Sequence, residues 1–231
     1  MSAKYLTYYD ADVDLEDVEL FEDGRWLNDK CIDLFIEYLD HNLTSKDDIS
    51  RSKVFLLRAA LTYLISNIQD STFLAGALPK RIFTAQVIFM IVNDNVDVTK
   101  ARGGNHWSLL IFIRKTNKFL HYDSANGMNI GVAKYNAMRI ASVLNVTGSS
   151  FHNMKTPLQE NGNECGIYVI SIIEQLYQKV IKYYQAHHDD DDETEFDLAF
   201  EIEQDQIPTG REMRKRCKKI VQELREAYIQ K

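Results

Sequence analysis

The segment CGIYVISIIEQLYQKVIKYY, residues 165–184, constrains the fold more than any other part of this 231-residue chain. Its first half is apolar almost all round, without the polar face that a helix on a protein surface shows. Such a helix is stable only where other elements cover it. We therefore expect a central buried helix at 165–184, with the rest of the chain packed around it.

The remaining patterns predict further helices around a modest sheet. Apolar residues recur at helical spacing in four more segments, which are 28–43, 54–65, 132–146 and 211–230. Runs rich in β-branched and aromatic residues, typical of strands, lie at 81–94, 106–114 and 118–124, and a short strand with a loop falls within 150–164. The tripeptide KTN between the second and third runs predicts a hairpin. We expect an α+β fold in one domain, residues 1–231.

The composition fits one domain in a reducing compartment. With 45% hydrophobic and 26% charged residues, the chain has room for one large core. Its three cysteines are an odd number without a CxxC pair, which argues against a disulfide framework or a structural zinc site. No signal-peptide pattern is visible, and no apolar run approaches the roughly 18–20 residues that span a bilayer. We expect an intracellular protein of the cytoplasm or nucleus, without a membrane partner.

Charge is distributed unevenly around a net charge of −7. Residues 1–50 contain 14 acidic and 4 basic residues, whereas residues 209–231 contain 3 acidic and 8 basic residues. The acidic half disfavours nucleic acid and is either a solvated surface or an attraction for a basic protein partner. The acidic tract 187–197 is either a solvated loop, which we favour, or a metal-binding tract, and 96–105 is a polar loop.

Cys165 lies where the polar turn 159–164 meets the buried helix. Cys31 and Cys217 fall on the apolar stripes of predicted helices, so we expect both in the core. Cys165 instead begins its helix, where free N–H groups and the positive end of the helix dipole favour a thiolate. Gly166 removes a side chain that would crowd the backbone there. Cys165 is therefore a candidate nucleophile.

A cysteine nucleophile requires a base that a third group orients. If the hairpin turns within 115–118, His106 at the start of one strand lies opposite the end of the next, near Asp123. Histidine exchanges protons near neutral pH, and Asp123 on its other nitrogen would fix the tautomer. His121, on the same strand as Asp123, is the competing base and ranks second. The alternative is an exposed hairpin histidine and a strand-ending aspartate without a joint role.

Gln159 lies six residues before Cys165 in the loop that approaches it. Its side-chain amide would donate to a developing oxyanion together with the backbone N–H of Cys165. On the sequence alone, a solvated loop glutamine is the stronger interpretation.

These motifs together resemble the Ulp/sentrin-type cysteine proteases, which cut ubiquitin-like modifiers after a C-terminal Gly-Gly. The matching residues, in the family's order, are RWLND at 25–29, IVNDN at 91–95, His106-Trp107, Asp123 within HYDS, Gln159 and Cys165-Gly166. The likeness runs from about residue 5 to 184. The stretches YLTYYDADVDLEDVELF…WLND and GGNHWSLLIF…FLHYDS are most similar to the small deneddylases of this family.

The resemblance implies a papain-like α+β fold with the circularly permuted order His, Asp, Cys. It implies acyl transfer, in which Cys165 attacks the glycine carbonyl, His106 exchanges the protons, Asp123 orients the base and Gln159 stabilises the oxyanion. Neither a cofactor nor a metal is implied. The family's usual Asp before the nucleophile is replaced by Glu164, whose added methylene would shift a capping or oxyanion-loop contact.

The resemblance also implies a substrate site. Trp26 and Trp107 would close a narrow tunnel over Gly-Gly, and Asp29 belongs to the same substrate-contact motif; core packing is the alternative for both tryptophans. The expected partner is the neddylation modifier, with SUMO second, and we expect a monomer. Three other functions remain: a desumoylating protease, an acyltransferase of the same clan with the same three residues, and a non-catalytic binder of ubiquitin-like proteins.

Overall fold

The computed structural model describes residues 3–42, 52–95, 103–186, 196 and 200–229. Within them, five strands form one mixed sheet in the order β3-β4-β5-β6-β7, and β1 and β2 form a separate antiparallel pair. The strands are β1 Lys4–Tyr8, β2 Ala11–Asp14, β3 Val54–Leu57, β4 Val87–Asn93, β5 Trp107–Ile113, β6 Lys118–Tyr122 and β7 Ser150–Asn153. The helices are α1 Leu15–Glu19, α2 Asp29–Asn42, α4 Ala59–Asn67, α5 Ser71–Ala77, α6 Ile130–Val143, α7 Cys165–Ala186 and α9 Gly210–Ile229, with 3₁₀ turns at Lys80–Phe83 and Gln204–Gln206. The α+β class is confirmed.

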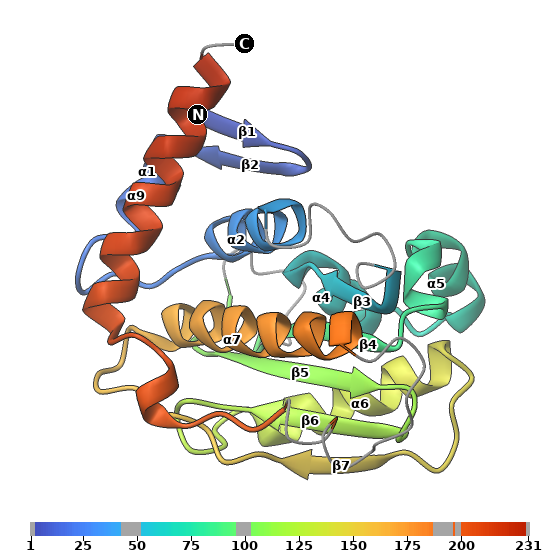
Figure 1. Cartoon of the computed structure of the whole chain (residues 1–231). Coiled ribbons are helices and arrows are strands. Elements are labelled where there is room, and N and C mark those ends of the chain that lie inside the picture. The colour runs from blue at the N-terminus through green and yellow to red at the C-terminus, as the bar shows by residue number, and fades with distance from the viewer. Residues whose placement is uncertain (1–2, 43–51, 96–102, 187–195, 197–199, 230–231) are drawn as a thin grey trace.

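Helix α7 is the central buried element that the sequence predicts. It lies across one face of the sheet over β5, with α2 and α9 packed against it (Figure 1). Its side chains join those of α2, α9 and the facing strand residues, among them Phe89, Leu109 and Ile111, in one core cluster. The nearly continuous apolar run of its first half follows from this cover on several sides.

A second core cluster occupies the other face of the sheet. Ile88, Met90, Leu110 and Phe112 point to that face and pack against α4, α5 and α6. Successive residues of β4 and β5 therefore point into opposite clusters, as the two-residue period of a strand requires. Strands covered on both faces have no polar alternation, which explains the uninterrupted apolar runs of β4 and β5.

The predicted hairpin is confirmed as β5 and β6. The two strands pair antiparallel with Leu109 opposite Tyr122 and Leu110 opposite His121. The turn contains Asn117 in the left-handed region, at φ 53°, a conformation that asparagine tolerates. Extended by three residues, this register places His106 beside the chain that leaves β6. The hairpin thus brings the start of β5 next to Asp123.

The prediction of one helix over 54–65 is wrong in its first part. Residues 54–57 form β3, which pairs parallel with β4, and α4 begins only at Ala59. Arg58 between them is extended, at ψ 154°, and the Asp33 carboxylate accepts the Ala59 N–H at 3.0 Å. A short apolar run is compatible with a helix or a buried strand, and here the pairing with β4 decides.

The prediction of a strand over 81–94 is also wrong at its start. A 3₁₀ turn beginning after Pro79 occupies 80–83, and β4 runs only from Val87 to Asn93. Ile82 in that turn is buried in the second cluster, so its apolar character reflects a packed turn and not a strand.

The remaining predictions are confirmed helices, a confirmed short strand and untested loops. The strand expected within 150–164 is β7. The helices expected at 28–43, 132–146 and 211–230 correspond to α2, α6 and α9. The predicted loops at 96–105 and 187–197 lie largely outside the described residues. None of the described helices contains an apolar stretch of the length that a membrane span requires. The hairpin β1–β2 and α1 were not predicted, because their apolar residues are few and alternate only briefly.

Candidate active site

Cys165 is the first residue of α7 and is only 3% exposed. The first bond of the helix runs from the Tyr168 N–H to the Glu164 carbonyl, 2.9 Å. The N–H groups that precede Tyr168 in this turn therefore lie outside the ladder of helix hydrogen bonds. Cys165 therefore lies at the positive end of the α7 dipole.

Gly166 allows the segment before α2 to approach the start of α7. A Cβ on Gly166 would lie 2.9 Å from the Cβ of Leu27, closer than side chains tolerate. On its other side, the Leu27 carbonyl accepts the indole N–H of Trp107 at 2.9 Å. Leu27 is thus held between the nucleophile helix and β5. Its neighbour Trp26 is 49% exposed, an unusual exposure for so large an apolar side chain.

His106 and Asp123 form the pair that the hairpin predicts. The His106 Nε2 lies 2.6 Å from the Asp123 Oδ1, and both residues are 3% exposed. Because Nε2 faces Asp123, Nδ1 is the nitrogen left for Cys165, whose nearby sulfur is, after Asp123, the second group that raises the pKa of His106. The three side chains therefore form one chain of contacts in the order Cys165, His106, Asp123.

Asp123 is held by backbone donors as well as by His106. Its Oδ1 accepts the Ala125 N–H at 2.8 Å and its Oδ2 accepts the Asn129 N–H at 2.7 Å. Burial alone would raise the pKa of Asp123, but the hydrogen bonds from His106, Asn129 and Ala125 outweigh it and lower the pKa. The carboxylate is therefore ionised and fixed, as an orienting group must be.

The environment of His106 favours the imidazolium form. Burial by itself lowers the pKa of His106, but the hydrogen bonds to Asp123 and Cys165, and the charges of both groups, raise it to about 9. A histidine with this pKa is protonated at neutral pH. The arrangement is that of an imidazolium placed between a carboxylate and a sulfur nucleophile.

The backbone around His106 is fixed by polar residues of the IVNDN motif. The Asp94 carboxylate accepts the N–H groups of Asn105 and His106 at 2.6 and 3.0 Å. The Asn93 amide donates to the His106 carbonyl at 3.2 Å. These contacts give the motif a physical role: residues at the end of β4 and just after it set the position of His106.

Asn129 is a site residue that sequence reasoning missed. It is 1% exposed, its N–H binds Asp123, and its side-chain amide donates to the His106 carbonyl and the Ser108 hydroxyl, both at 3.2 Å. No sequence signal separates it from other asparagines before helices. Asn129 is thus hydrogen-bonded to both His106 and Asp123.

His121, the competing base, lies apart from the nucleophile. Its Nδ1 is 2.8 Å from the Asn153 Oδ1 and its Nε2 is 3.1 Å from the Ser108 hydroxyl. Burial is the main cause that lowers the pKa of His121, which keeps the ring neutral. The ring is fully buried on the face of the sheet that α6 covers. Both nitrogens are thus occupied by structural partners.

Gln159 approaches the site through the chain that follows β6. Its N–H donates to the Ser124 carbonyl at 3.0 Å, and its Oε1 accepts the Ser124 hydroxyl at 2.8 Å. Its Nε2 donates to the Asn161 carbonyl at 2.7 Å, which leaves the second amide hydrogen for another acceptor. The loop therefore fixes the orientation of this amide beside the residue that follows Asp123.

Glu164 and Asp29 occupy the starts of two helices. Glu164, which directly precedes the nucleophile, is 8% exposed, and its carboxylate lies against the α-carbon of Gly210. Asp29 is exposed in the first turn of α2. Asn28 before it makes the contact of an N-cap, since its Oδ1 accepts the Cys31 N–H at 3.0 Å.

Cys31 and Cys217 are core residues, as predicted. Both are fully buried, and burial strongly raises the pKa of each thiol. Neither is a candidate nucleophile under such conditions. Among the described residues, no group of three His, Cys, Asp or Glu side chains is arranged to hold a metal ion.

A buried cysteine at a helix N-terminus, an imidazolium and a fixed carboxylate on an α+β scaffold are the arrangement of a cysteine protease or a related enzyme of acyl transfer. Residues 25–208 match the model of the Ulp1 protease family, C-terminal catalytic domain, and the chain belongs to that family. It acts on ubiquitin-like proteins as a cysteine-type peptidase.

Relatives and solved structures agree with this assignment. The chain is 32% identical over 185 residues to the probable sentrin-specific protease 8 of Dictyostelium discoideum, covering 77% of this chain and 76% of that one. It is 28% identical to the NEDD8-specific protease 1 of Arabidopsis thaliana, covering 73% of each. The crystal structure of the Ulp1 protease domain in complex with Smt3, the yeast orthologue of SUMO, has the same fold, with a TM-score of 0.61 at 16% identity over 97% of this chain and 89% of that one.

Proposed function

We propose that this protease is a deneddylase that cleaves after the C-terminal Gly-Gly of the neddylation modifier, with Cys165, His106 and Asp123 as its catalytic residues. The observation that carries the reaction is the 2.6 Å contact between His106 and Asp123, with the other ring nitrogen left for Cys165. The observation that favours this modifier is that relatives named for sentrin-specific protease 8 and for NEDD8-specific proteases match in sequence. SUMO is the second candidate.

The reaction begins from the pair formed by Cys165 and His106. The sulfur attacks the carbonyl carbon of the modifier's terminal glycine, and a C–S bond forms as the carbonyl becomes an oxyanion. His106, protonated at Nδ1, gives its proton to the leaving amine when the C–N bond breaks. The neutral ring then takes a proton from water, which attacks the thioester and releases the modifier with a free carboxylate. Asp123 keeps the ring in the required tautomer throughout.

The oxyanion is stabilised by two donors in this proposal. One is the backbone N–H of Cys165, which lies outside the helix ladder of α7. The other is the Nε2 of Gln159, whose second hydrogen is not used by the Asn161 carbonyl. Fixed donors of this kind stabilise charge that develops only in the transition state.

The tail of the modifier lies between Trp26 and Trp107 in this proposal. Trp107 is half-buried, and its indole N–H donates to the Leu27 carbonyl, so its position is fixed. Trp26, the residue before Leu27, is exposed and available to a substrate. A passage between two indoles admits glycines and excludes larger side chains. Asp29, exposed at the start of α2, lies in the same segment and would contact the modifier.

Competitive labelling tests both the chemistry and the modifier. The neddylation modifier, SUMO and ubiquitin, each with a C-terminal electrophile, are mixed with the protein at equal concentration. We expect preferential labelling by the neddylation modifier, and none in Cys165→Ala. Preferential labelling by SUMO would identify a desumoylase, and labelling by none, with acyl-donor turnover, would identify an acyltransferase. A monomeric state and an intracellular location stay predictions.

A further inference from the structure

Arg214 of α9, at 1% exposed, is the largest side chain among the fully buried residues that the structure describes. Its guanidinium binds four main-chain carbonyls from two distant segments. Nη1 donates to Leu20 and Glu22, both at 3.0 Å, and Nη2 donates to Arg25 at 2.6 Å and to Asn163 at 3.1 Å. One planar cation therefore joins residues 20–25 to the loop at 163.

These two segments carry the substrate and the nucleophile. Arg25 directly precedes Trp26, and Asn163 lies two residues before Cys165. The same Nη2 atom of Arg214 binds both carbonyls, so the distance between the two segments is fixed through a single nitrogen. The segment that contains Trp26 and the loop before Cys165 are thus both bound to the Arg214 guanidinium.

The contacts of Arg214 are better explained by the positions that they fix than by a contribution to the stability of the fold. In the described part of the chain its partners are all carbonyls, and its Nε has no partner. Burying a cation without a carboxylate is expensive, and apolar replacements of buried charges are often as stable. The rigid, planar fork of a guanidinium fixes several acceptors at once, as no apolar side chain does.

We propose that Arg214 is a positioning residue of the protease: it sets the spacing between the tail-binding segment and the nucleophile loop. It touches neither the substrate nor the reacting atoms in this role and acts by setting where Trp26 lies relative to Cys165. The proposal rests on the proposed reaction at Cys165.

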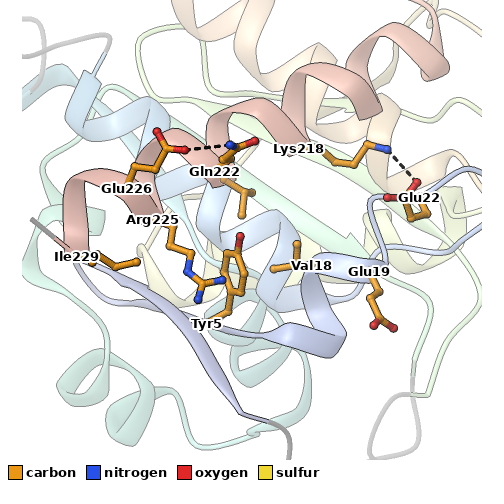
Figure 2. A pocket seen from close by; sticks show the side chains of 10 residues that line it. Tyr5, Val18, Glu19, Glu22, Lys218, Gln222, Arg225, Glu226 and Ile229 are labelled. Atoms are coloured by element: carbon orange, nitrogen blue, oxygen red, sulfur yellow. Dashed lines mark hydrogen bonds and ion pairs between the residues drawn. The ribbon is translucent and has the colours of Figure 1, made fainter.

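Helix α9 is itself anchored to the N-terminal part of the chain, which makes Arg214 a fixed point. Figure 2 shows the groove between α9 and the first elements, where Lys218 pairs with Glu22 at 2.8 Å and the guanidinium of Arg225 lies 3.8 Å from the ring centre of Tyr5. These contacts lie one and three turns beyond Arg214 along the same helix. The contacts of Lys218 and Arg225 thus hold in place the first turns of α9, which carry Arg214.

The start of α9 makes a second contact with the nucleophile loop. A Cβ at Gly210 would collide with the carboxylate of Glu164, the residue before Cys165. A carboxylate at a helix N-terminus is stabilised by the backbone dipoles. The longer Glu164, in place of the family's usual Asp, therefore reaches the helix that carries Arg214.

The match to the family model does not include this helix. It covers residues 25–208, so Arg25 and Asn163 fall inside it, whereas α9 and Arg214 fall outside. The positioning contact therefore joins the catalytic domain to an element beyond the matched region.

The test compares Arg214→Met with Arg216→Met. Arg216, two residues along the same helix, donates to both oxygens of Glu174 on α7, one of them at 2.5 Å, and touches neither segment of the site. Arg214→Met leaves four main-chain carbonyls without their donor, and Arg216→Met leaves the buried Glu174 carboxylate without its partner, so both substitutions break an existing set of contacts and both lower the melting temperature. We expect kcat of Arg214→Met to fall about 100-fold on the modifier that the wild type cleaves, as misplacement by about 1 Å predicts, with normal kcat in Arg216→Met. Arg214→Lys, with one charge and no fork, restores part of the rate.

Two further measurements separate positioning from general destabilisation. Alkylation of Cys165 by iodoacetamide needs no tail site, so we expect Arg214→Met to react at the wild-type rate. Hydrogen exchange should quicken at residues 20–28 and 161–166 in Arg214→Met only. Parallel losses of turnover and alkylation, or unchanged kcat and exchange, would overturn the proposal. If the wild type cleaves no modifier, the proposed function fails, and the exchange comparison still decides the role of Arg214.

Discussion

The protonation state of His106 depends strongly on the Asp123 carboxylate, which a single substitution can remove. Asp123 raises the pKa of His106 through both a hydrogen bond and its charge, against burial, which lowers it. The imidazolium required to protonate the leaving amine therefore persists until the pH rises through about 9. Above that pH the ring loses its proton and the pair with Cys165 is lost.

We predict that Asp123→Asn lowers both kcat and the pH at which activity is lost. Without the carboxylate charge, the pKa of His106 falls, so the basic limb of the rate profile moves to lower pH. The wrong tautomer also slows the reaction, by roughly 10⁴-fold where such a change has been made in a comparable triad. The measurement is kcat/KM from pH 6 to 10. An unchanged basic limb near pH 9 would show that it does not report His106.

His106 and His121, both buried, are expected to respond in opposite ways to substitution by alanine. His106→Ala removes the base and nearly all turnover. His121→Ala leaves the Ser108 hydroxyl without one partner and opens a cavity, which costs about 1–3 kcal/mol of stability while the catalytic residues stay in place. Turnover and chemical denaturation of both variants provide the check. A stable, inactive His121→Ala would reverse the assignment of the base.

At the scale of elements, the start of α7 depends on its close approach to Leu27. We predict that Gly166→Ala lowers stability by about 1–3 kcal/mol, as overpacking does, and reduces kcat/KM, because the added Cβ pushes Leu27 away from the nucleophile. The matched control is Gly131→Ala on α6, where a Cβ meets nothing within 4 Å. There helix propensity favours alanine by up to about 1 kcal/mol. Normal kcat/KM in Gly166→Ala would refute this role.

The elements that the sequence predicts are those with strong local patterns. The long apolar run of α7, the hairpin β5–β6 and the stripe of α9 extend over enough residues for their periods to be read. The hairpin also brings His106 to Asp123, since short-range pairing fixes the register. The prediction of a helix is wrong for residues 54–57 because the four apolar residues of β3 show no periodicity. Only pairing with β4, which is distant in the sequence, makes them a strand.

The site contacts that escaped prediction come from polar residues far apart in sequence. Arg214 and Arg25, 189 residues apart, meet only because α9 returns to the N-terminal segment. Asn129 looks like any residue before a helix until β6 places Asp123 beside it. Such contacts leave no periodic trace in the sequence. They can be recognised only after the apolar residues have been packed into the fold.

At the scale of the whole molecule, exposed acidic residues lie close to Trp26 in the sequence. Glu22, Asp23 and Asp29 are all exposed in or beside this segment, and the chain as a whole carries a net charge of −7. Of these, Glu22 is paired with Lys218. Exposed charges near a binding site act mainly on the rate of encounter with a partner of opposite charge.

We therefore predict that kcat/KM for the modifier falls as salt concentration rises, and that Asp23→Asn with Asp29→Asn weakens this dependence. At about 0.15 M salt, charges interact over roughly 8 Å, so only groups near the interface contribute. The control substrate is a short peptide amide ending in Gly-Gly, which enters the same tunnel without the body of the modifier and should show no salt dependence. The measurement is kcat/KM for both substrates between 0.02 and 0.5 M salt. If both substrates respond alike, the salt acts on the catalytic pair, and the acidic surface has no part in recognition.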